Sequence, residues 1–302
     1  MKICINFPMR ASKHYARWID GGRFGDIAVA VEQSGFDAIA VSEHPFPNRE
    51  WLAEGGHHAF DPFVALSAWA AVTDRIVLMT AIAVAGYRSP YLTAKAGTTL
   101  DIVSDGRAVL GLGAGYLEQE FEVLGADFAR RGALFDEAVA AMRASWRGED
   151  FDGPNYPAHG HEALPAPVQP GGPPIWVGGN SKAARRRAVS LADGWMPIAQ
   201  DATMAAITRT PPLTDHTELK EQIREVVQRR DERDEAPLDI AFTPFEKHVM
   251  STGMSEYARA LRDAMTAYEE AGVNWLVVEP RSRSLADFRE DLDTLAAGLG
   301  RA

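Results

Sequence analysis

The feature that most constrains this fold is an alternation of short apolar runs with longer segments of helical spacing. Eight apolar runs have the length and composition of buried strands, at residues 3–7, 38–42, 76–83, 108–112, 175–177, 195–198, 238–242 and 275–278. Helical spacing occurs between and after them, at residues 24–34, 62–72, 89–104, 131–146, 181–192, 217–233, 255–271 and 285–299. Strands separated by helices pair in parallel through right-handed crossovers. The pattern therefore predicts an α/β fold, a closed (β/α)8 TIM barrel forming a single domain over residues 1–302.

A doubly wound open sheet is the main alternative for such an alternation. That fold carries a glycine fingerprint directly after its first strand, whereas Phe7, Pro8 and Met9 stand at this point in the sequence. The irregular stretch over about 148–174 contains 12 Pro and Gly among 27 residues and reads as an insertion between strands 4 and 5. We expect this insertion to be functional, because loops of that length are uncommon.

Charge and composition exclude several classes of protein. The formal net charge is −11, from 31 Lys and Arg against 42 Asp and Glu, and no basic stripe suggests nucleic-acid binding. The start MKICINFP has no signal-peptide pattern, and no apolar stretch is long enough for a membrane helix. Cys4 stands in an apolar run and is interpreted as a buried thiol. The sequence predicts a cytoplasmic protein whose partner is a small-molecule substrate, with no nucleic acid and no membrane.

In a TIM barrel, the loops that follow the strands carry the function. Glu43 and His44 follow the second run, and such a pair can hold a cofactor edge or pass a proton, because histidine titrates near neutral pH. A loop histidine satisfied by backbone groups is the alternative. Thr80, Ala81 and Ile82 lie in the third run, whose end has small residues. Small residues let a planar ring approach the backbone, or else reflect tight packing inside the barrel.

The fourth run ends in alternate glycines, which indicate crowded backbone or a bulge. Gly113 and Gly115 precede Tyr116, and Glu120 follows four residues later. Tyr116 and Glu120 could face a pocket, or Glu120 could only favour the start of the next helix. The histidines at 57–58 and at 159 and 161 lie beside no acidic ligands, so no metal site is expected.

The fifth run gives the strongest local signal for a ligand. It ends in Gly178, Gly179, Asn180 and Ser181. Glycines at a strand exit can leave backbone N–H groups free, and a capped helix N-terminus attracts an anion. We predict a phosphate site here, with an ordinary capped helix as the alternative. Trp195 in the sixth run could wall a planar ring or lie in the core.

Taken in order, these residues resemble the bacterial luciferase-like flavin and deazaflavin oxidoreductases. The matching segments are Gly35-Phe36-Asp37, Ser42-Glu43-His44, Tyr87-Arg88-Ser89-Pro90, Leu100–Arg107, Leu110–Tyr116, Glu120-Phe121, Leu124-Gly125, Arg131, Ile175–Gly179 and Ala192–Trp195. They cover most of residues 1–200 and are specific as an ordered set. The similarity is greatest to the branch that uses the deazaflavin coenzyme F420.

The resemblance implies a luciferase-like TIM barrel, a homodimer, and F420 (or FMN as the alternative) across the barrel mouth. It implies a bulge in the third strand near residues 80–82, often with a non-proline cis peptide, behind the cofactor ring. It also implies phosphate binding by residues 178–181 and places His44 near the ring. The remaining residues of the expected cofactor site are Gly113, Tyr116, Glu120 and Trp195.

Two positions depart from the resemblance. Tyr116 stands where some sugar-phosphate dehydrogenases of the group have a glutamate, and Pro45-Phe46-Pro47 replaces a tryptophan. The resemblance therefore does not carry a sugar-phosphate substrate to this chain.

Three functions follow for testing. The first is hydride transfer between F420 and a small organic substrate, with His44 as general acid or base beside Glu43 and Tyr116. The second is an FMN-dependent monooxygenase that uses reduced flavin and O2, and the third is a cofactor-binding barrel without catalysis. We expect the substrate to be chosen by residues 48–60, by the insertion and by the ends of strands 7 and 8, with Trp51 favouring an apolar or planar molecule.

Overall fold

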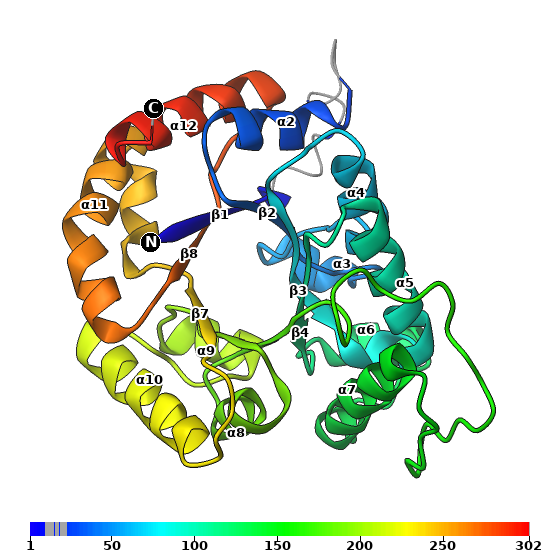
Figure 1. The fold of residues 1–302 in the computed structure, drawn as a ribbon. Helices are drawn as coiled ribbons and strands as arrows, with labels where there is room; N and C mark the ends of the chain where they lie inside the picture. The colour runs from blue at the N-terminus through cyan, green and yellow to red at the C-terminus, as the bar shows by residue number, and fades with distance from the viewer. Residues whose placement is uncertain (10–14, 16–17, 19–22, 302) are drawn as a thin grey trace.

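The computed structural model describes residues 1–9, 15, 18 and 23–301. Its strands are β1 (Lys2–Asn6), β2 (Ala38–Val41), β3 (Val77–Val84), β4 (Ala108–Gly113), β5 (Ile175–Gly178), β6 (Gly194–Met196), β7 (Asp239–Phe242) and β8 (Trp275–Val278). Within the described residues they form a closed parallel barrel, in which each strand pairs with the next and β8 pairs with β1 (Figure 1). The predicted TIM barrel is confirmed, and each predicted apolar run overlaps a strand.

Helices surround the barrel (Figure 1). In the described part of the chain they are α2 (Asp26–Gln33), α3 (Arg49–Ala53), α4 (Pro62–Ala70), α5 (Pro90–Val103), α6 (Glu118–Val123), α7 (Arg131–Arg147), α8 (Lys182–Leu191), α9 (Ala202–Thr208), α10 (His216–Asp231), α11 (Met254–Ala271) and α12 (Leu285–Gly298), with 3-10 turns η2 (Ala85–Tyr87) and η3 (Phe245–Ser251). The eight predicted helices are present, whereas the short helices α3, α6 and α9 were not predicted. Over the same residues, no helix has the length and apolar character needed to cross a membrane.

Two helices begin at a proline that follows a potential N-cap residue. α4 begins at Pro62, and the Asp61 carboxylate accepts hydrogen bonds from the backbone N–H groups of Phe63 and Val64. α5 begins at Pro90, but its N-cap Ser89 makes no side-chain capping bond. The fixed φ of proline at the first helical position is therefore the feature that the two starts share.

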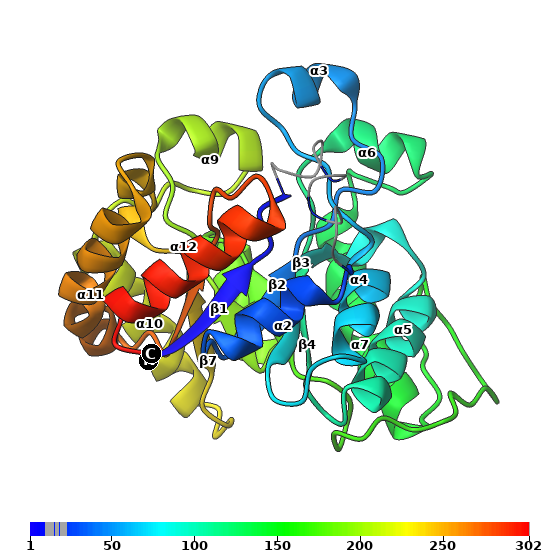
Figure 2. The same cartoon turned by 90° about the horizontal axis from the view of Figure 1, so that it is seen from above.

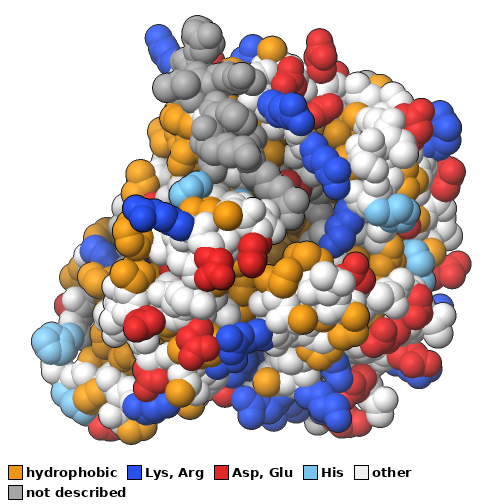
Figure 3. Space-filling view, turned by 180° about the vertical axis from the view of Figure 1, so that it is seen from behind, with side chains coloured by type: hydrophobic (Ala, Val, Ile, Leu, Met, Phe, Trp, Pro, Cys, Tyr) orange, Lys and Arg blue, Asp and Glu red, His pale blue; other side chains and the backbone are white. Residues whose placement is uncertain are grey.

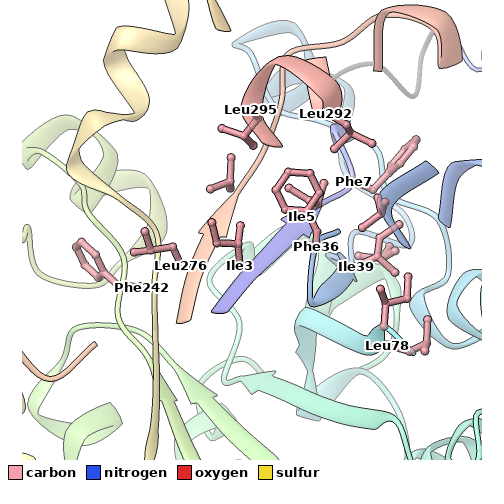
Figure 4. Packing of buried hydrophobic residues seen from close by; sticks show 14 of the residues in the cluster. Ile3, Ile5, Phe7, Phe36, Ile39, Leu78, Phe242, Leu276, Leu292 and Leu295 are labelled. Carbon is pink, nitrogen blue, oxygen red and sulfur yellow. The ribbon is translucent and has the colours of Figure 1, made fainter. Parts of the chain in front are cut away.

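Alternation along the strands separates two layers of the core. Cys4, Ala40 and Val277 belong to the cluster inside the barrel. Their neighbours along the strands pack outward against the helices, and Figure 4 shows Ile3, Ile5 and Leu276 with Leu292 and Leu295 of α12. Burial raises the pKa of the Cys4 thiol, which keeps it protonated.

The two ends of the barrel differ in what covers them. Figure 2 shows α3, α6 and α9 beyond the carboxyl ends of the strands. The insertion at 148–174 packs on the outer surfaces of α5 and α7 instead, where the Tyr91 hydroxyl donates to Tyr156 O at 2.5 Å and Gln169 N–H donates to Asp101 at 2.9 Å. These contacts, with that of Asn155 and Glu137, hold the insertion against the two helices, and its role in choosing the substrate stays a prediction.

Candidate active site

His44 lies two residues beyond Ser42 on the side of β2 that faces the barrel mouth. Its side chain is 6% exposed. The ring bridges two other groups, because Nδ1 lies 2.9 Å from Oε2 of Glu120 and Nε2 lies 3.1 Å from the hydroxyl of Tyr116. The sequence predicted all three residues as site residues, and the structure brings them together.

Glu120, in α6, is fully buried and accepts three hydrogen bonds. Its Oε1 accepts from the Phe46 backbone N–H at 2.9 Å, and its Oε2 accepts from the Tyr87 hydroxyl at 2.8 Å as well as from His44. An ionised carboxylate only accepts hydrogen bonds, so the proton of His44 is assigned to Nδ1. Nε2 is then the acceptor for the Tyr116 hydroxyl. We call Tyr116, His44, Glu120 and Tyr87 the histidine relay.

Both phenols of the relay keep their protons at neutral pH. Burial, helped by the negative charge of Glu120, raises the pKa of Tyr116 to about 12. Burial and the hydrogen bond to Glu120 raise the pKa of Tyr87 as well. The two tyrosines therefore act as hydrogen-bond donors to Nε2 and to the carboxylate.

Glu43 does not join this group, although the sequence predicted it as a catalytic partner of His44. Its Oε2 accepts from the Val84 N–H at 2.7 Å, and its Oε1 lies 2.5 Å from the Arg88 guanidinium. Successive side chains of an extended strand point to opposite sides, which turns Glu43 away from His44. Burial raises the pKa of Glu43, against the opposing effect of Arg88. The correction is that Glu43 braces the end of β3.

The predicted irregularity of β3 is confirmed. The Ala81–Ile82 peptide is cis, and the register with β4 shifts between Thr80 and Ala83. The Thr80 hydroxyl donates to Gly111 O at 2.7 Å, which ties the bulge to β4.

Ile82 crosses the inner surface of the barrel and explains the glycines opposite it. A Cβ added at Gly113 would lie 2.4 Å from Ile82 Cδ1, and one added at Gly178 would lie 2.7 Å from the same atom. Gly111 is equally constrained, since its Cβ would lie 2.1 Å from Thr80 O. We call Ile82, Gly111, Gly113 and Gly178 the apolar floor.

The loop after β5 is more constrained than the sequence suggested. The N–H of Gly179, at φ +107°, donates to Met196 O at 3.0 Å. The N–H of Asn180 donates to the Thr210 hydroxyl at 2.8 Å. The expectation that the glycines of this loop leave their N–H groups free is therefore wrong for Gly179. Ser181 caps α8 as predicted, since its hydroxyl accepts from the Ala184 N–H, and an anion would meet the first turn of α8 instead.

Two predicted binding residues turn out to support this loop. The Asn180 side chain is fully buried and bonds to the backbone of Ile198 and Pro211. The Trp195 ring is fully buried in the outer core layer, and its Nε1 donates to Gly179 O at 2.9 Å. The correction is that neither side chain faces the barrel mouth, because both are committed to holding the loop.

Sequence reasoning did not join two aromatic groups to His44, although it expected Trp51 to favour an apolar or planar substrate. The Trp51 ring, from α3, has its centroid 4.7 Å from that of His44, and the His57 ring centroid lies at 4.9 Å. Tyr87 belongs to the segment 87–90 that carries part of the family resemblance, but no local sequence signal joins it to Glu120, 33 residues away.

Figure 3 views the face on which the strands end, opposite to the view of Figure 1, and shows acidic and basic side chains interspersed around it. Within residues 1–9, 15, 18 and 23–301, no three His, Cys, Asp or Glu side chains form a group able to hold a metal ion. The groups that the structure places at this end of the barrel are the histidine relay and the apolar floor.

Comparisons agree with this architecture. The family model for luciferase-like monooxygenases matches residues 1–265. A Mycobacterium tuberculosis protein described as uncharacterized is 30% identical over 241 residues, covering 74% of this chain and 75% of the relative. An F420-dependent glucose-6-phosphate dehydrogenase of Gordonia bronchialis is 29% identical over 292 residues, covering 88% and 82%. This chain thus belongs to the luciferase-like monooxygenase family of enzymes.

Solved structures share the fold. The monooxygenase RslO1 from Streptomyces bottropensis superposes with a TM-score of 0.77 at 20% identity, covering 99% of this chain and 98% of that one. An F420-dependent secondary alcohol dehydrogenase, solved with an F420-acetone adduct, has a TM-score of 0.72 at 18% identity, covering 99% of each chain. At these identities the likeness concerns the barrel alone.

Proposed function

We propose that this enzyme transfers a hydride between coenzyme F420 and a small organic substrate. The observation that carries the proposal is the histidine relay at the barrel mouth, next to the apolar floor. F420-dependent relatives that cover most of the chain support the choice of cofactor. The relay supplies what hydride transfer to or from an oxygen-bearing carbon requires, which is a group that exchanges one proton with the substrate.

The residues present fit such a cofactor. Gly113 and Gly178 leave no room for a Cβ against Ile82, and Gly111 leaves none against Thr80 O, so we expect the floor to present a smooth apolar surface to a planar ring. The first turn of α8 faces the same end of the barrel and would hold a phosphate, with Ser181 fixing its N-terminus. Bound F420 supplies a ring carbon that accepts or donates hydride.

The relay explains how the proton is handled. In the direction of alcohol oxidation, Nε2 of His44 takes the hydroxyl proton as the substrate carbon loses hydride, and a carbonyl forms. The Glu120 carboxylate on Nδ1 holds the imidazole in the tautomer that can accept this proton, and stabilises the imidazolium that results. Tyr116 occupies Nε2 when no substrate is bound, so substrate displaces it or passes its proton through it.

An FMN-dependent monooxygenase is the second candidate. The family model is described by that activity, and the monooxygenase RslO1 shares the barrel. The apolar floor would accept a flavin ring as well as a deazaflavin ring. We rank this function second because the F420-dependent relatives are similar in sequence over most of the chain.

An anaerobic turnover assay tests the proposal. We expect secondary alcohols to reduce F420 with one carbonyl formed per F420, without O2, and His44→Ala to lower kcat by about 10²–10⁴. His159→Ala, on the exposed insertion, is the matched control and should leave turnover unchanged. Turnover that requires reduced FMN and consumes O2 would instead establish the monooxygenase.

A further inference from the structure

Polar side chains face the barrel mouth from the strands β8, β1 and β2, beside the strands that form the apolar floor. Asn6 ends β1 and lies two residues beyond the interior residue Cys4, and Glu279 lies two residues beyond the interior residue Val277. The Nδ2 of Asn6 donates to Oε2 of Glu279 at 3.0 Å. The alternation of strand side chains therefore turns this pair toward the mouth.

The bond to Glu279 fixes the orientation of the Asn6 amide. Because a carboxylate needs a donor, Nδ2 faces Glu279 and Oδ1 is left as an acceptor. Asn6 is only 9% exposed, and among the described residues its Oδ1 has no hydrogen-bond partner. A buried acceptor without a partner costs free energy, which a ligand donor would recover.

Ser42 supplies a second such atom on the same wall. Its Oγ is buried and likewise finds no partner within the part of the chain that the structure describes. The register pairs Asn6 with Ala40, and Ser42 follows two residues later, directly after the end of β2. His44 lies two residues beyond Ser42, which is at most about 6.6 Å in extended chain.

We propose that Asn6, Ser42 and Glu279 form a subsite for a substrate hydroxyl group next to the carbon that exchanges hydride. The proposal rests on the proposed function, because His44 defines where the reacting hydroxyl lies. Asn6 Oδ1 accepts from the ligand, Ser42 can accept or donate, and the Glu279 carboxylate holds the Asn6 amide in this orientation. A hydroxyl suits this set, whereas a carboxylate or phosphate at the same place would meet two acceptors.

The subsite predicts a substrate class. The substrate is a small neutral alcohol with a second hydroxyl on the carbon next to the one that exchanges hydride. The His44 end of the pocket binds the reacting oxygen, and the Asn6 end binds the second. Discrimination against a molecule lacking the second hydroxyl is expected, since it would leave the Asn6 acceptor unpaired.

The test compares three secondary alcohols as hydride donors to F420, under anaerobic conditions and with the full chain. They are 2,3-butanediol, 2-butanol and 3-hydroxybutanoate. We expect kcat/KM for 2,3-butanediol to exceed that for 2-butanol by about tenfold or more, and 3-hydroxybutanoate to be the poorest. Asn6→Leu, which keeps the size and removes the acceptor, should abolish most of this preference while leaving 2-butanol within about twofold.

Cys4→Ala is the matched control, because Cys4 faces the interior from the same strand, one layer below, and should keep the wild-type preference. Equal kcat/KM for 2,3-butanediol and 2-butanol in the wild type would overturn the subsite while leaving F420-dependent hydride transfer standing. A preference that survives Asn6→Leu would overturn it as well.

Absence of turnover with all three alcohols would count against the proposed function. The subsite would then be tested by measuring the binding of the alcohols. Ligand-observed NMR should show 2,3-butanediol, but not 2-butanol, losing contact with the protein in Asn6→Leu. Equal signals for the two alcohols in the wild type, or an unchanged 2,3-butanediol signal in Asn6→Leu, would reject the proposed subsite. If Asn6→Leu does not fold, Ser42→Ala repeats the comparison.

Discussion

Replacing Glu120 by glutamine tests the histidine relay with the smallest possible change. Glu120 accepts three hydrogen bonds on two oxygens, from Phe46 N–H, Tyr87 and His44. Glutamine has the same shape, but one of its two terminal atoms is a donor. If the NH2 replaces Oε1 it faces the Phe46 N–H, a second donor, and if it replaces Oε2 then His44 must change tautomer and the Tyr87 hydroxyl must accept instead of donate. We expect the free energy of unfolding to fall by about 1–3 kcal/mol.

The effect on catalysis depends on which side the NH2 takes. If it replaces Oε2, Nδ1 of His44 becomes an acceptor and Nε2 carries the proton, so Nε2 can no longer act as a base. A catalytic histidine in the wrong tautomer loses about 10⁴ in rate, and loss of a general base costs about 10²–10⁴. We therefore expect Glu120→Gln to lower kcat by about 10²–10⁴ with F420 affinity nearly unchanged.

The assay needs three readouts. Anaerobic F420 reduction gives kcat and KM, a fluorescence titration gives cofactor affinity, and 15N NMR of His44 reports the tautomer. Glu118→Gln is the matched control, because Glu118 lies in the same helix but is exposed and forms an ion pair with Arg209 at the surface. The reasoning is refuted if Glu120→Gln keeps kcat within about twofold of the wild type, or if Nδ1 of His44 carries no proton in the wild type.

Three further predictions follow from the same contacts. The pKa of Tyr116 is raised from 10.0 to about 12, so between these pH values the folded state keeps a proton that the unfolded state loses. The free energy of unfolding should therefore fall by about 1.4 kcal/mol per pH unit in this range. Urea unfolding at pH 9 and 11 should show a smaller fall in this free energy for Tyr116→Phe than for the wild type, and equal falls would contradict the prediction. Arg88→Met leaves Glu43 buried without its cation and should cost about 3–5 kcal/mol at pH 8. The cost should be smaller at pH 5, because a protonated Glu43 tolerates burial, so equal costs at both pH values would argue against it. Gly113→Ala should cost about 1–3 kcal/mol through contact with Ile82 Cδ1, and Ile82→Val, which removes that atom, should restore part of it in a double-mutant cycle; additive losses would show that the two positions do not clash.

The barrel could be predicted because its signals are local and repeated. Each strand is a run of apolar residues, and each long helix shows its own 3.6-residue period, so the order of elements was readable without any contact. α3, α6 and α9 escaped because helices of five to seven residues are too short to show a period. α6 matters most, since it carries Glu120 to His44.

The site was predicted only as far as residue identity allows. His44, Tyr116 and Glu120 were identified, but the bond between His44 and Glu120 joins positions 76 residues apart and depends on tertiary structure. Asn180, in the loop after β5, and Trp195, in β6, were expected to bind the cofactor, yet both side chains face away from the mouth. A short strand end does not reveal from sequence which face is inside, and a one-residue change in alternation reverses every side chain.

The apolar floor was likewise predicted only in part. The sequence displayed small residues in β4 and β5 without showing what lay opposite them. The structure supplies the answer in Ile82, whose Cδ1 atom occupies the space that side chains at Gly113 and Gly178 would need. Close packing between residues on different strands is therefore what sequence reasoning could not reach.

The most direct test of the central claim is a fluorescence titration of the purified protein with oxidised F420 and, separately, with FMN. The account predicts saturable binding of F420 and much weaker binding of FMN, with Glu118→Gln behaving as the wild type. Tighter binding of FMN would contradict it and move the monooxygenase to first place. No saturable binding of either cofactor would leave a barrel whose relay serves no F420- or FMN-dependent reaction.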